Sequence, residues 1–234
     1  SAGSGLVIVF FISFSLIQTF IPFAAWIGAI LTTLIVFVLS KEGNKIVVER
    51  LVLGGVAISS LFGAIQATLL LNAEDGRIQA ALNWLIGSLN ARGWQEIKFT
   101  ALPILIALFI GIFLYRQLNL LSLGDELSVS LGTSLFRSRC LIGAIATLLA
   151  ACAVSIGGLI GFIGLIVPHF SRLLIGNDFK YILPFSALIG ALTLSSADLI
   201  SRLGPIEIPV GIVTALLGAP VFMIILYNRK NFKK

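Results

Sequence analysis

Charge is the first thing that this sequence lacks. Charged residues make up 11% of its 234 residues and hydrophobic residues 58%, whereas soluble domains carry about 25% charged and about 45–50% apolar residues. So few charges cannot cover a surface that faces water. The composition therefore excludes a soluble enzyme domain, a disordered chain and a disulfide-stapled secreted domain, and it indicates a multi-pass membrane protein.

Groups that perform chemistry are also rare. The only histidine is His169, so no histidine cluster can bind a metal, and the phosphate-binding pattern GxxxxGK[ST] is absent. The two cysteines, Cys140 and Cys152, lie in an apolar stretch and are expected to be buried small side chains rather than a disulfide. We therefore expect no catalytic residue, no metal and no cofactor bound by this chain.

The apolar runs are long and do not alternate with polar residues, which favours helices over the strands of a membrane barrel. They predict an all-α fold, a polytopic membrane helical bundle in a single domain over residues 1–234. The eight predicted spans are residues 5–20, 23–39, 51–72, 99–115, 140–156, 159–168, 182–200 and 210–227. The sixth of them, residues 159–168, is short and is expected to be sheltered by protein or to extend toward Leu174.

Basic residues divide unequally between the two sides of this bundle. If the chain begins on the cytoplasmic side, twelve of the sixteen lysines and arginines fall inside and four outside. This bias predicts an even number of spans and a cytoplasmic C-terminus. Topology and contact with anionic lipid explain the basic inner face, so no nucleic-acid partner is expected.

The connection at residues 116–139 is too long to be a simple turn. It predicts two short amphipathic cytoplasmic helices, separated at Gly124 and ended near Gly132, with Asp125 and Glu126 at the start of the second. A structured connection of this length favours a coupling surface over a plain linker. Residues 73–98, with Trp84 and Trp94, predict a further short helix at the membrane interface.

Glycines recur at helical spacing in two of the predicted spans. Gly157, Gly158, Gly161 and Gly164 would form a flat strip on one face of the sixth span, where another backbone can approach closely, and Pro168 would end or bend it. Gly54, Gly55 and Gly63 suggest the same in the third span. Two interpretations of these glycines remain: tight helix packing, or a position beside a translocation path.

Asp198 and Arg202 lie near the predicted outer end of the seventh span. Their spacing of four residues, with the acid first, predicts an ion pair within one helix. Arg202 could also face an external partner that carries a carboxylate. Asp198 is the only acid within a predicted span, and a transporter driven by an ion gradient would place acids at mid-membrane, so that class is disfavoured.

Several motifs together resemble one family. Residues 157–169 read GGLIGFIGLIVPH and continue FSRLLIG, residues 207–215 read EIPVGIVTA, residues 218–220 read GAP, and residues 118–126 read LNLLSLGDE. Ala197-Asp198 with Arg202, and residues 84–89 with Trp94, belong to the same pattern. The sequence resembles FecCD-type permeases, the membrane subunits of ATP-driven importers for iron–siderophores, haem and cobalamin.

The resemblance implies a type II ABC importer permease fold with ten helices in each subunit of a dimer. Eight of these are expected here, and the family's first two helices are expected to be absent. The implied function is translocation of an iron–siderophore or related chelate from an external binding protein to the cytoplasm. Haem or cobalamin import by the same mechanism, and a truncated remnant without transport activity, are the alternatives.

The resemblance also implies roles for particular residues. The ATPase-coupling residues would be Leu121, Gly124, Asp125, Glu126, Leu131 and Gly132, and Arg202 would dock the binding protein. Residues 45–49 would correspond to an inner gate, but this chain has Ile46-Val47-Val48 where the family often has small hydroxyl residues, so no gate residue is assigned. Helix packing or the pathway would involve Gly54, Gly55, Gly158, Gly161, Gly164, Pro168, Pro209, Gly211, Gly218 and Pro220.

The partners implied by the resemblance are a second permease subunit, ATPase subunits that use ATP, an extracellular binding protein and the lipid bilayer. The chain itself is not expected to be an enzyme. The implied location is the bacterial cytoplasmic (inner) membrane. The pathway lining is expected around residues 51–72 and 210–223, whose apolar character suits a bulky ligand moving past a wall that does not hold it.

Overall fold

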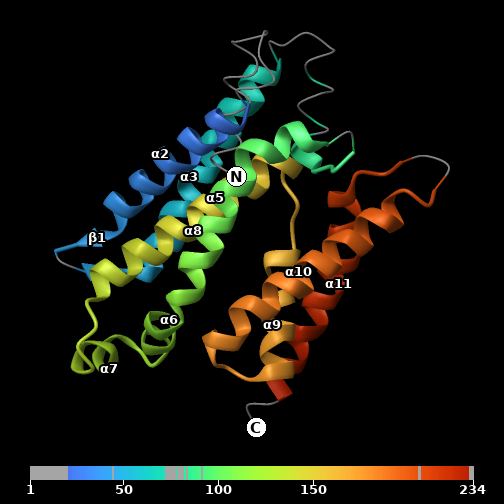
Figure 1. Ribbon diagram of the computed structural model, residues 1–234. Coiled ribbons are helices and arrows are strands. Elements are labelled where there is room, and N and C mark those ends of the chain that lie inside the picture. Colours follow the sequence, from blue (N-terminus) through green and yellow to red (C-terminus); the bar gives the residue numbers. More distant parts are fainter. Residues whose placement is uncertain are drawn as a thin grey trace.

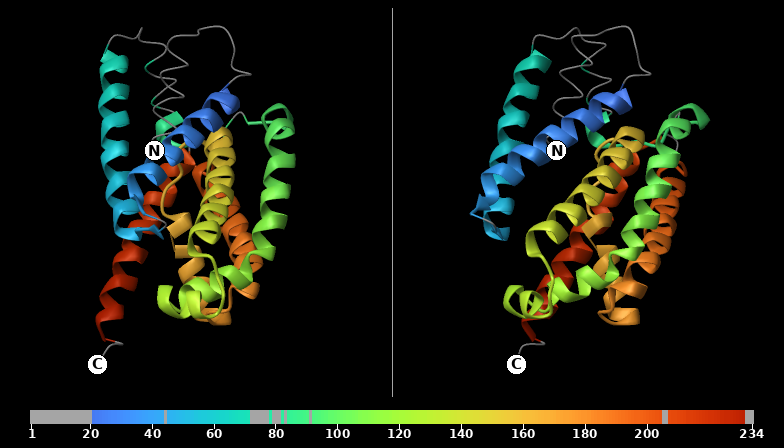
Figure 2. Two further views of the ribbon diagram at one scale, coloured as in Figure 1. Left: turned by 90° about the vertical axis from the view of Figure 1, so that its left-hand side faces the viewer. Right: turned by 60° about the vertical axis from the view of Figure 1, so that its left-hand side comes forward.

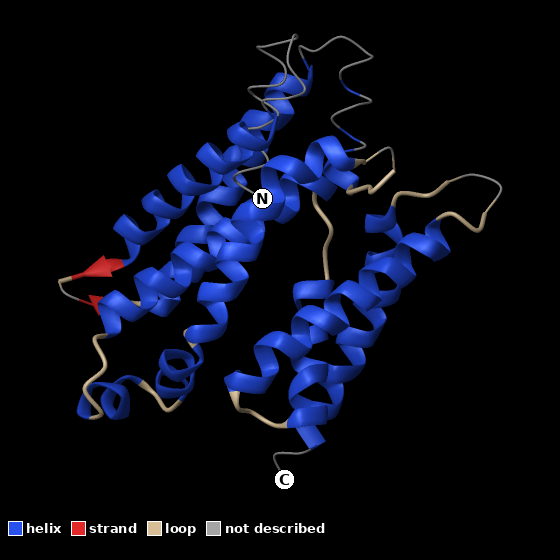
Figure 3. Ribbon diagram, viewed as in Figure 1, coloured by secondary structure: helices blue, strands red, loops and turns tan. Residues whose placement is uncertain are grey.

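The computed structural model describes residues 21–43, 45–71, 78, 82, 84–90, 92–204 and 207–231. The predicted first span, residues 5–20, lies outside this part of the chain, as does much of the predicted interface helix between residues 73 and 98. Figures 1 and 3 show that the described chain is built almost wholly from helices. The prediction of an all-α helical bundle is confirmed.

The helices follow one another along the chain. A two-stranded antiparallel hairpin, β1 (Lys41–Glu42) and β2 (Lys45–Ile46), joins α2 to α3, with Lys41 opposite Ile46. The helices are α2 (Ile21–Ser40), α3 (Val48–Leu71), α5 (Trp94–Phe113), α6 (Tyr115–Ser122), α7 (Asp125–Ser130), α8 (Leu135–Gly157), α9 (Ile163–Ile175), α10 (Phe179–Ser201) and α11 (Val210–Asn231).

Several helices are apolar enough to cross a membrane. Within the described residues, α3, α8 and α10 are long and apolar enough to span a membrane. Helices α5 and α6 together form a fourth candidate span, which bends by 52° between Phe113 and Tyr115. Residues 26–40, α9 and residues 210–225 are shorter apolar helices. Large apolar side chains such as Leu102 and Leu188 are about two-thirds exposed, which suits contact with lipid rather than water.

The helices pack in two groups that meet at α10. One group contains α2, α3, α5 and α8, and the other contains α9, α10 and α11. Helix α10 also contacts α5 and α6, so it joins the two groups (Figure 2). Small side chains lie at the contacts: Ser40, Ser171 and Ser201 are almost fully buried and donate to carbonyl oxygens three or four residues earlier in their own helices.

The sixth predicted span, residues 159–168, is wrong at its start, whereas its expected extension toward Leu174 is confirmed. Helix α8 continues to Gly157, residues 158–162 are not helical, and α9 begins at Ile163 and passes through Pro168 to Ile175. The break occurs because Gly158 and Phe162 have φ angles of 71° and 67°, which a right-handed helix does not accommodate. Proline can bend a helix without ending it, and contact with α10 extends along α9.

This break also corrects the predicted glycine strip. Gly157 ends α8, Gly158 and Gly161 lie in the connection, and Gly164 lies in α9. The four glycines therefore do not share one helix face.

Other predicted boundaries differ more modestly. The connection predicted at residues 116–139 ends at Ser134, because residues 135–139 belong to the start of α8. The span placed at residues 99–115 is α5, which begins earlier, at Trp94, and ends at Phe113. Residues 84–86 are helical, and Gly87, with a φ of 81°, stops that helix.

Candidate functional site

A compact unit of two short helices lies at one end of the bundle. We call residues 115–132, which comprise α6, α7 and their turns, the coupling unit (Figure 1). Gly124 precedes α7 with φ 99° and ψ 163°, and Gly132 follows it with φ 82°. The conformation of Gly124 is essentially reserved for glycine, so the predicted break between the two helices is confirmed at this residue.

Ser128 holds the two short helices together. Its hydroxyl oxygen lies 2.7 Å from the carbonyl oxygen of Leu120 in α6 and 2.6 Å from that of Gly124, and the residue is fully buried. The carbonyl of Ser128 accepts a hydrogen bond from the amide of Thr133 at 2.9 Å. The sequence prediction missed this residue, since a serine within an amphipathic stretch carries no local signal of burial.

The coupling unit exposes several large apolar side chains. Leu123, Leu127, Val129 and Leu131 are each more than half exposed. Gly124, Asp125, Glu126 and Gly132 are also exposed, whereas Leu121 is half-buried. The residues predicted for coupling therefore lie together on one short unit, and all of them except Leu121 are exposed.

Two side chains fasten the coupling unit to the bundle. Asp125 Oδ1 pairs with Arg139 Nη2 of α8 at 2.6 Å. In α6, Asn119 Nδ2 donates to Asp178 Oδ1 at 2.8 Å, and the Phe179 amide donates to Asn119 Oδ1 at 3.0 Å. The unit is thus connected to both helix groups through polar contacts.

Asp178 caps the first turn of α10. Its carboxylate also accepts from the Lys180 amide at 2.9 Å, as the N-terminus of a helix requires. The side-chain hydrogen bond from Asn119, followed by that amide, lowers the pKa of Asp178 below its ordinary value. Asp178 is therefore held as a carboxylate where α6 meets α10.

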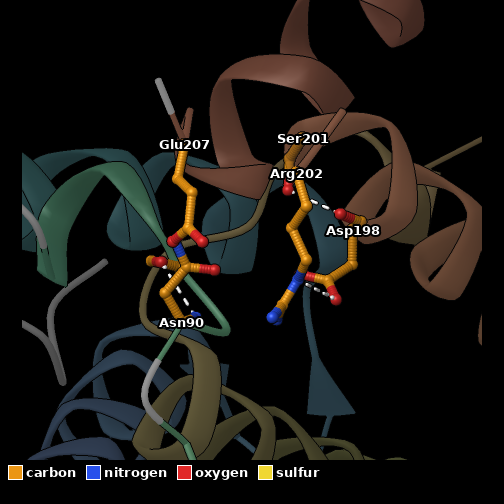
Figure 4. Close-up of polar contacts among 6 residues, drawn as sticks. Asn90, Asp198, Ser201, Arg202 and Glu207 are labelled. Carbon is orange, nitrogen blue, oxygen red and sulfur yellow. Dashed lines mark hydrogen bonds and ion pairs between the residues drawn. The ribbon is translucent and has the colours of Figure 1, made fainter. Parts of the chain in front are cut away.

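The opposite end of α10 carries the predicted ion pair. Arg202 Nε lies 3.0 Å from Asp198 Oδ2, and Arg202 Nη2 lies 3.2 Å from Asp198 Oδ1 (Figure 4). Hydrogen bonding and attraction by Asp198, together with weaker attraction by Glu207, raise the pKa of Arg202. The predicted pair is confirmed, and the guanidinium remains accessible because 44% of the Arg202 side chain is exposed.

A second polar contact lies beside this pair. Asn90 Nδ2 donates to Glu207 Oε2 at 2.8 Å, and the Ile208 amide donates to the Ser201 carbonyl at 3.1 Å. Figure 4 shows the Arg202 side chain between Asp198 and the Asn90–Glu207 pair. Sequence reasoning assigned no role to Asn90 or Glu207, because 117 residues separate them.

Glycines allow the segment at residues 84–90 to enter the bundle at this same end. The Gly211 amide donates to the Gly87 carbonyl at 3.0 Å, and the Ser88 amide donates to the Gly157 carbonyl at 2.9 Å. A Cβ added to Gly211 would overlap the carbonyl of Ile86, and one added to Gly158 would overlap that of Trp84. These glycines are required for close backbone approach.

The other predicted packing residues differ in their surroundings. A Cβ at Gly218 would lie 2.5 Å from Phe162 Cβ, and one at Gly54 would lie 3.8 Å from Val36 Cγ1. Within the described chain, a Cβ added at Gly55, Gly161 or Gly164 would have no neighbouring atom within 4 Å. Pro168 and Pro220 lie inside α9 and α11, and Pro209 directly precedes α11.

Two hollows lie along the apolar helices. A cavity of about 420 Å³ lies among α9, α10 and α11, with almost wholly apolar lining that includes Phe162, Phe170, Leu192 and Gly218. A shallower hollow of about 580 Å³ follows the face of α3 that carries Gly55, Ser59 and Ser60. Among the described residues, no three histidine, cysteine, aspartate or glutamate side chains are grouped to hold a metal ion.

Comparisons with known proteins agree with this arrangement. The chain is 39% identical to the cobalamin import system permease protein BtuC of Halobacterium salinarum, 40% identical to the Fe(3+)-citrate import system permease protein YfmE of Bacillus subtilis, and 37% identical to the hemin transport system permease protein HmuU of Yersinia pestis. Each match covers 88% of this chain, and the matches cover 56%, 62% and 62% of the three relatives.

The three-dimensional likeness extends over almost the whole chain. A solved structure of a metal-chelate-type ABC transporter in an inward-facing conformation matches with a TM-score of 0.90 and 32% identity, over 97% of this chain and 73% of that one. The model of the FecCD transport family matches residues 1–228. The chain is a multi-pass membrane protein that belongs to the FecCD transport family.

Proposed function

We propose that this chain is the permease component of an ATP-driven importer that moves a metal chelate, with a ferric siderophore as the first candidate, into the cytoplasm. The observation that carries the proposal is the TM-score of 0.90 to a metal-chelate-type ABC transporter, over 97% of this chain. The names of the curated relatives, which include citrate, haem and cobalamin permeases, support the same class of cargo.

The coupling unit is proposed to dock the ATPase. Its exposed leucines and valine supply an apolar contact surface, and Glu126 is accessible beside them. ATP binding and hydrolysis are assigned to that separate ATPase subunit, and no cofactor is assigned to this chain. Movement of the docked ATPase would then reach α10 through Asn119 and α8 through Asp125.

The opposite end of α10 is proposed to face the external binding protein. Arg202 retains an exposed guanidinium although it is paired with Asp198, so it can also donate hydrogen bonds to a carboxylate of that protein. This assignment places the coupling unit and the C-terminus on the cytoplasmic side. The excess of basic residues on that side supports it.

A second permease subunit is proposed to complete the pathway. None of the described side chains of α3 is buried, and the face with Gly55, Ser59 and Ser60 forms an open hollow. A wall of small and apolar residues suits a bulky chelate that passes without being held. Because these residues provide no charged ligand, the choice of chelate would rest largely on the binding protein.

Haem or cobalamin is the second candidate cargo, because the relatives' names include both. To separate the candidates, uptake of radiolabelled ferric siderophore, haem and cobalamin is measured in cells with and without the gene. The proposal expects the uptake of one of them to require this gene and cellular ATP. Equal uptake of all three with and without the gene would contradict it.

A further inference from the structure

One arginine joins two parts of the chain that the proposed function leaves unconnected. Arg139 lies near the start of α8 and donates through Nη2 to Asp125 Oδ1 of the coupling unit at 2.6 Å. Its other terminal nitrogen, Nη1, donates to the carbonyl oxygen of Ile46 in β2 at 2.7 Å. The two acceptors are 79 residues apart in the sequence, and this side chain bridges them.

The two hydrogen bonds of Arg139 differ in their surroundings. Only 16% of the Arg139 side chain and 1% of Ile46 are exposed, whereas 50% of the Asp125 side chain is exposed. Both bonds come from a charged donor and are therefore stronger than neutral ones, and exclusion of water further strengthens the bond to Ile46. Arginine suits this position because its planar fork presents two nitrogens in fixed directions, whereas a lysine offers a single point charge.

The hairpin that Arg139 holds is itself tied to the helix that follows it. The Val47 amide donates to the Ser40 carbonyl at 3.1 Å and closes the hairpin. Glu42 of β1 pairs with Arg50 in the first turn of α3 at 3.2 Å. The Lys41 ammonium also lies 5.7 Å from the ring centre of Phe136, which neighbours Arg139 on α8. Displacement of the hairpin would therefore displace the start of α3.

We infer that Arg139 is a positioning residue that links the coupling unit to the α2–α3 hairpin and so transmits movement of α7 to α3. This inference rests on the proposed function, since the proposed ATPase supplies the movement. Figure 1 shows the hairpin and the coupling unit at the same end of α8. The link is separate from the contacts of Asn119 with the start of α10, so the coupling unit has polar contacts with each helix group.

The test compares Arg139→Gln with Arg137→Gln, a matched change two residues away on the same helix. Arg137 is exposed, whereas Arg139 is mostly buried. Spin labels at Val48→Cys and Ser130→Cys report the distance between the start of α3 and the coupling unit. The background carries Cys140→Ser, because Cys152 is fully buried and Cys140 is not.

The link predicts a narrow distance distribution in the protein with Arg139 and a wider one in the Arg139→Gln variant. Arg137→Gln should leave the distribution narrow. Asp125→Asn and Arg139→Lys should each widen it partly, and these variants carry the test if Arg139→Gln does not accumulate in the membrane. Equal distributions in the Arg139 and Arg137 variants would overturn the link, whether or not the protein couples to an ATPase.

A second measurement separates a transmitting residue from a static brace. In proteoliposomes with the ATPase and binding protein, import is measured for whichever of ferric siderophore, haem and cyanocobalamin the unaltered protein carries. Arg139→Gln should keep ATP hydrolysis but lower import per ATP by about tenfold, as expected for loss of a charge-assisted hydrogen bond. Unchanged import per ATP would refute transmission. Failure of the unaltered protein to import any of the three would count against the proposed function instead.

Discussion

Asn119 of α6 and Asp178 at the start of α10 hold one another across the interface between two helices. Asn119 Nδ2 donates to Asp178 Oδ1 at 2.8 Å, and Asn119 Oδ1 accepts from the Phe179 amide at 3.0 Å. Both functional groups of the asparagine are thus used to fix the first turn of α10. A short helix that is proposed to receive force from an ATPase is fastened to a helix that extends toward the other face of the bundle.

This relationship predicts a stability that depends on pH. The pKa of Asp178 is lowered in the folded protein, so its carboxylate stabilises the fold at pH values above its unfolded pKa, and this stabilisation is lost as the pH falls through the lowered folded pKa. Asp178→Asn should therefore lower the midpoint of thermal unfolding at neutral pH. The difference between the two proteins should shrink below the ordinary aspartate pKa of about 3.9.

Thermal unfolding in detergent between pH 3 and pH 7 measures this effect. Glu126→Gln is the control, because Glu126 is exposed and makes no ion pair with the residues that the structure describes. The control should change the midpoint little. A difference between Asp178→Asn and the unaltered protein that stays constant down to pH 3 would show that the carboxylate charge is not what stabilises this end of α10.

Gly211 is predicted to be intolerant of even a methyl group. A Cβ there would overlap the carbonyl of Ile86, whose position is fixed by the hydrogen bond from the Gly211 amide to Gly87. Gly211→Ala should lower the free energy of unfolding by about 1–3 kcal/mol, the usual cost of overpacking. Gly55→Ala, with no neighbour within 4 Å at that position, should be neutral or slightly stabilising. Equal effects of the two changes would contradict this packing.

The conformation of Gly124 predicts a separate effect on ATPase binding. Its φ of 99° and ψ of 163° are strained for alanine, so Gly124→Ala should shift α7 and reduce the amount of ATPase that purifies with the protein. Gly63→Ala, in open space on α3, serves as the control.

Replacing Gly124, Asp125 and Glu126 together by alanine should uncouple ATP hydrolysis from import. Normal coupling in the triple variant would place the ATPase contact elsewhere.

Arg202 is predicted to determine affinity for the external binding protein. Arg202→Glu should weaken docking by about tenfold or more, because a repulsive charge replaces an exposed guanidinium. Lys98→Glu makes the same change of charge at another exposed position on the predicted outer side and should have a smaller effect. Asp198→Asn should weaken docking moderately, because Asp198 holds the Arg202 side chain in place. Surface plasmon resonance on nanodisc-embedded protein measures all three, and equal affinities would remove the external role of Arg202.

Much of the helical architecture could be predicted because lipid imposes a simple rule on sequence. Long apolar runs must be helical in a bilayer, and this placed α3, α8, α10 and α11 within a few residues of their observed positions. Two other features are local patterns as well. One is the glycine required at a turn, Gly124, and the other is an acid four residues before a base, Asp198 and Arg202. The structure therefore agrees with the sequence at those positions.

The remaining features depend on contacts between distant residues. The break after α8 requires positive φ angles at Gly158 and Phe162, beside the Trp84 carbonyl and Gly218 respectively. Asn119 and Asp178 are 59 residues apart, and Arg139 and Ile46 are 93 apart. No local pattern of hydrophobicity or spacing identifies such partners, because tertiary packing decides them.

The most direct test of the proposed function is the energy source for import. The protein is purified with its associated subunits, reconstituted into proteoliposomes and supplied in turn with ferric siderophore, haem and cyanocobalamin, with either ATP or a proton gradient. We predict that at least one chelate accumulates with ATP, that the proton gradient does not replace ATP, and that the triple alanine variant at residues 124–126 abolishes accumulation. Accumulation driven by the proton gradient without ATP would contradict the assignment as an ATP-driven permease.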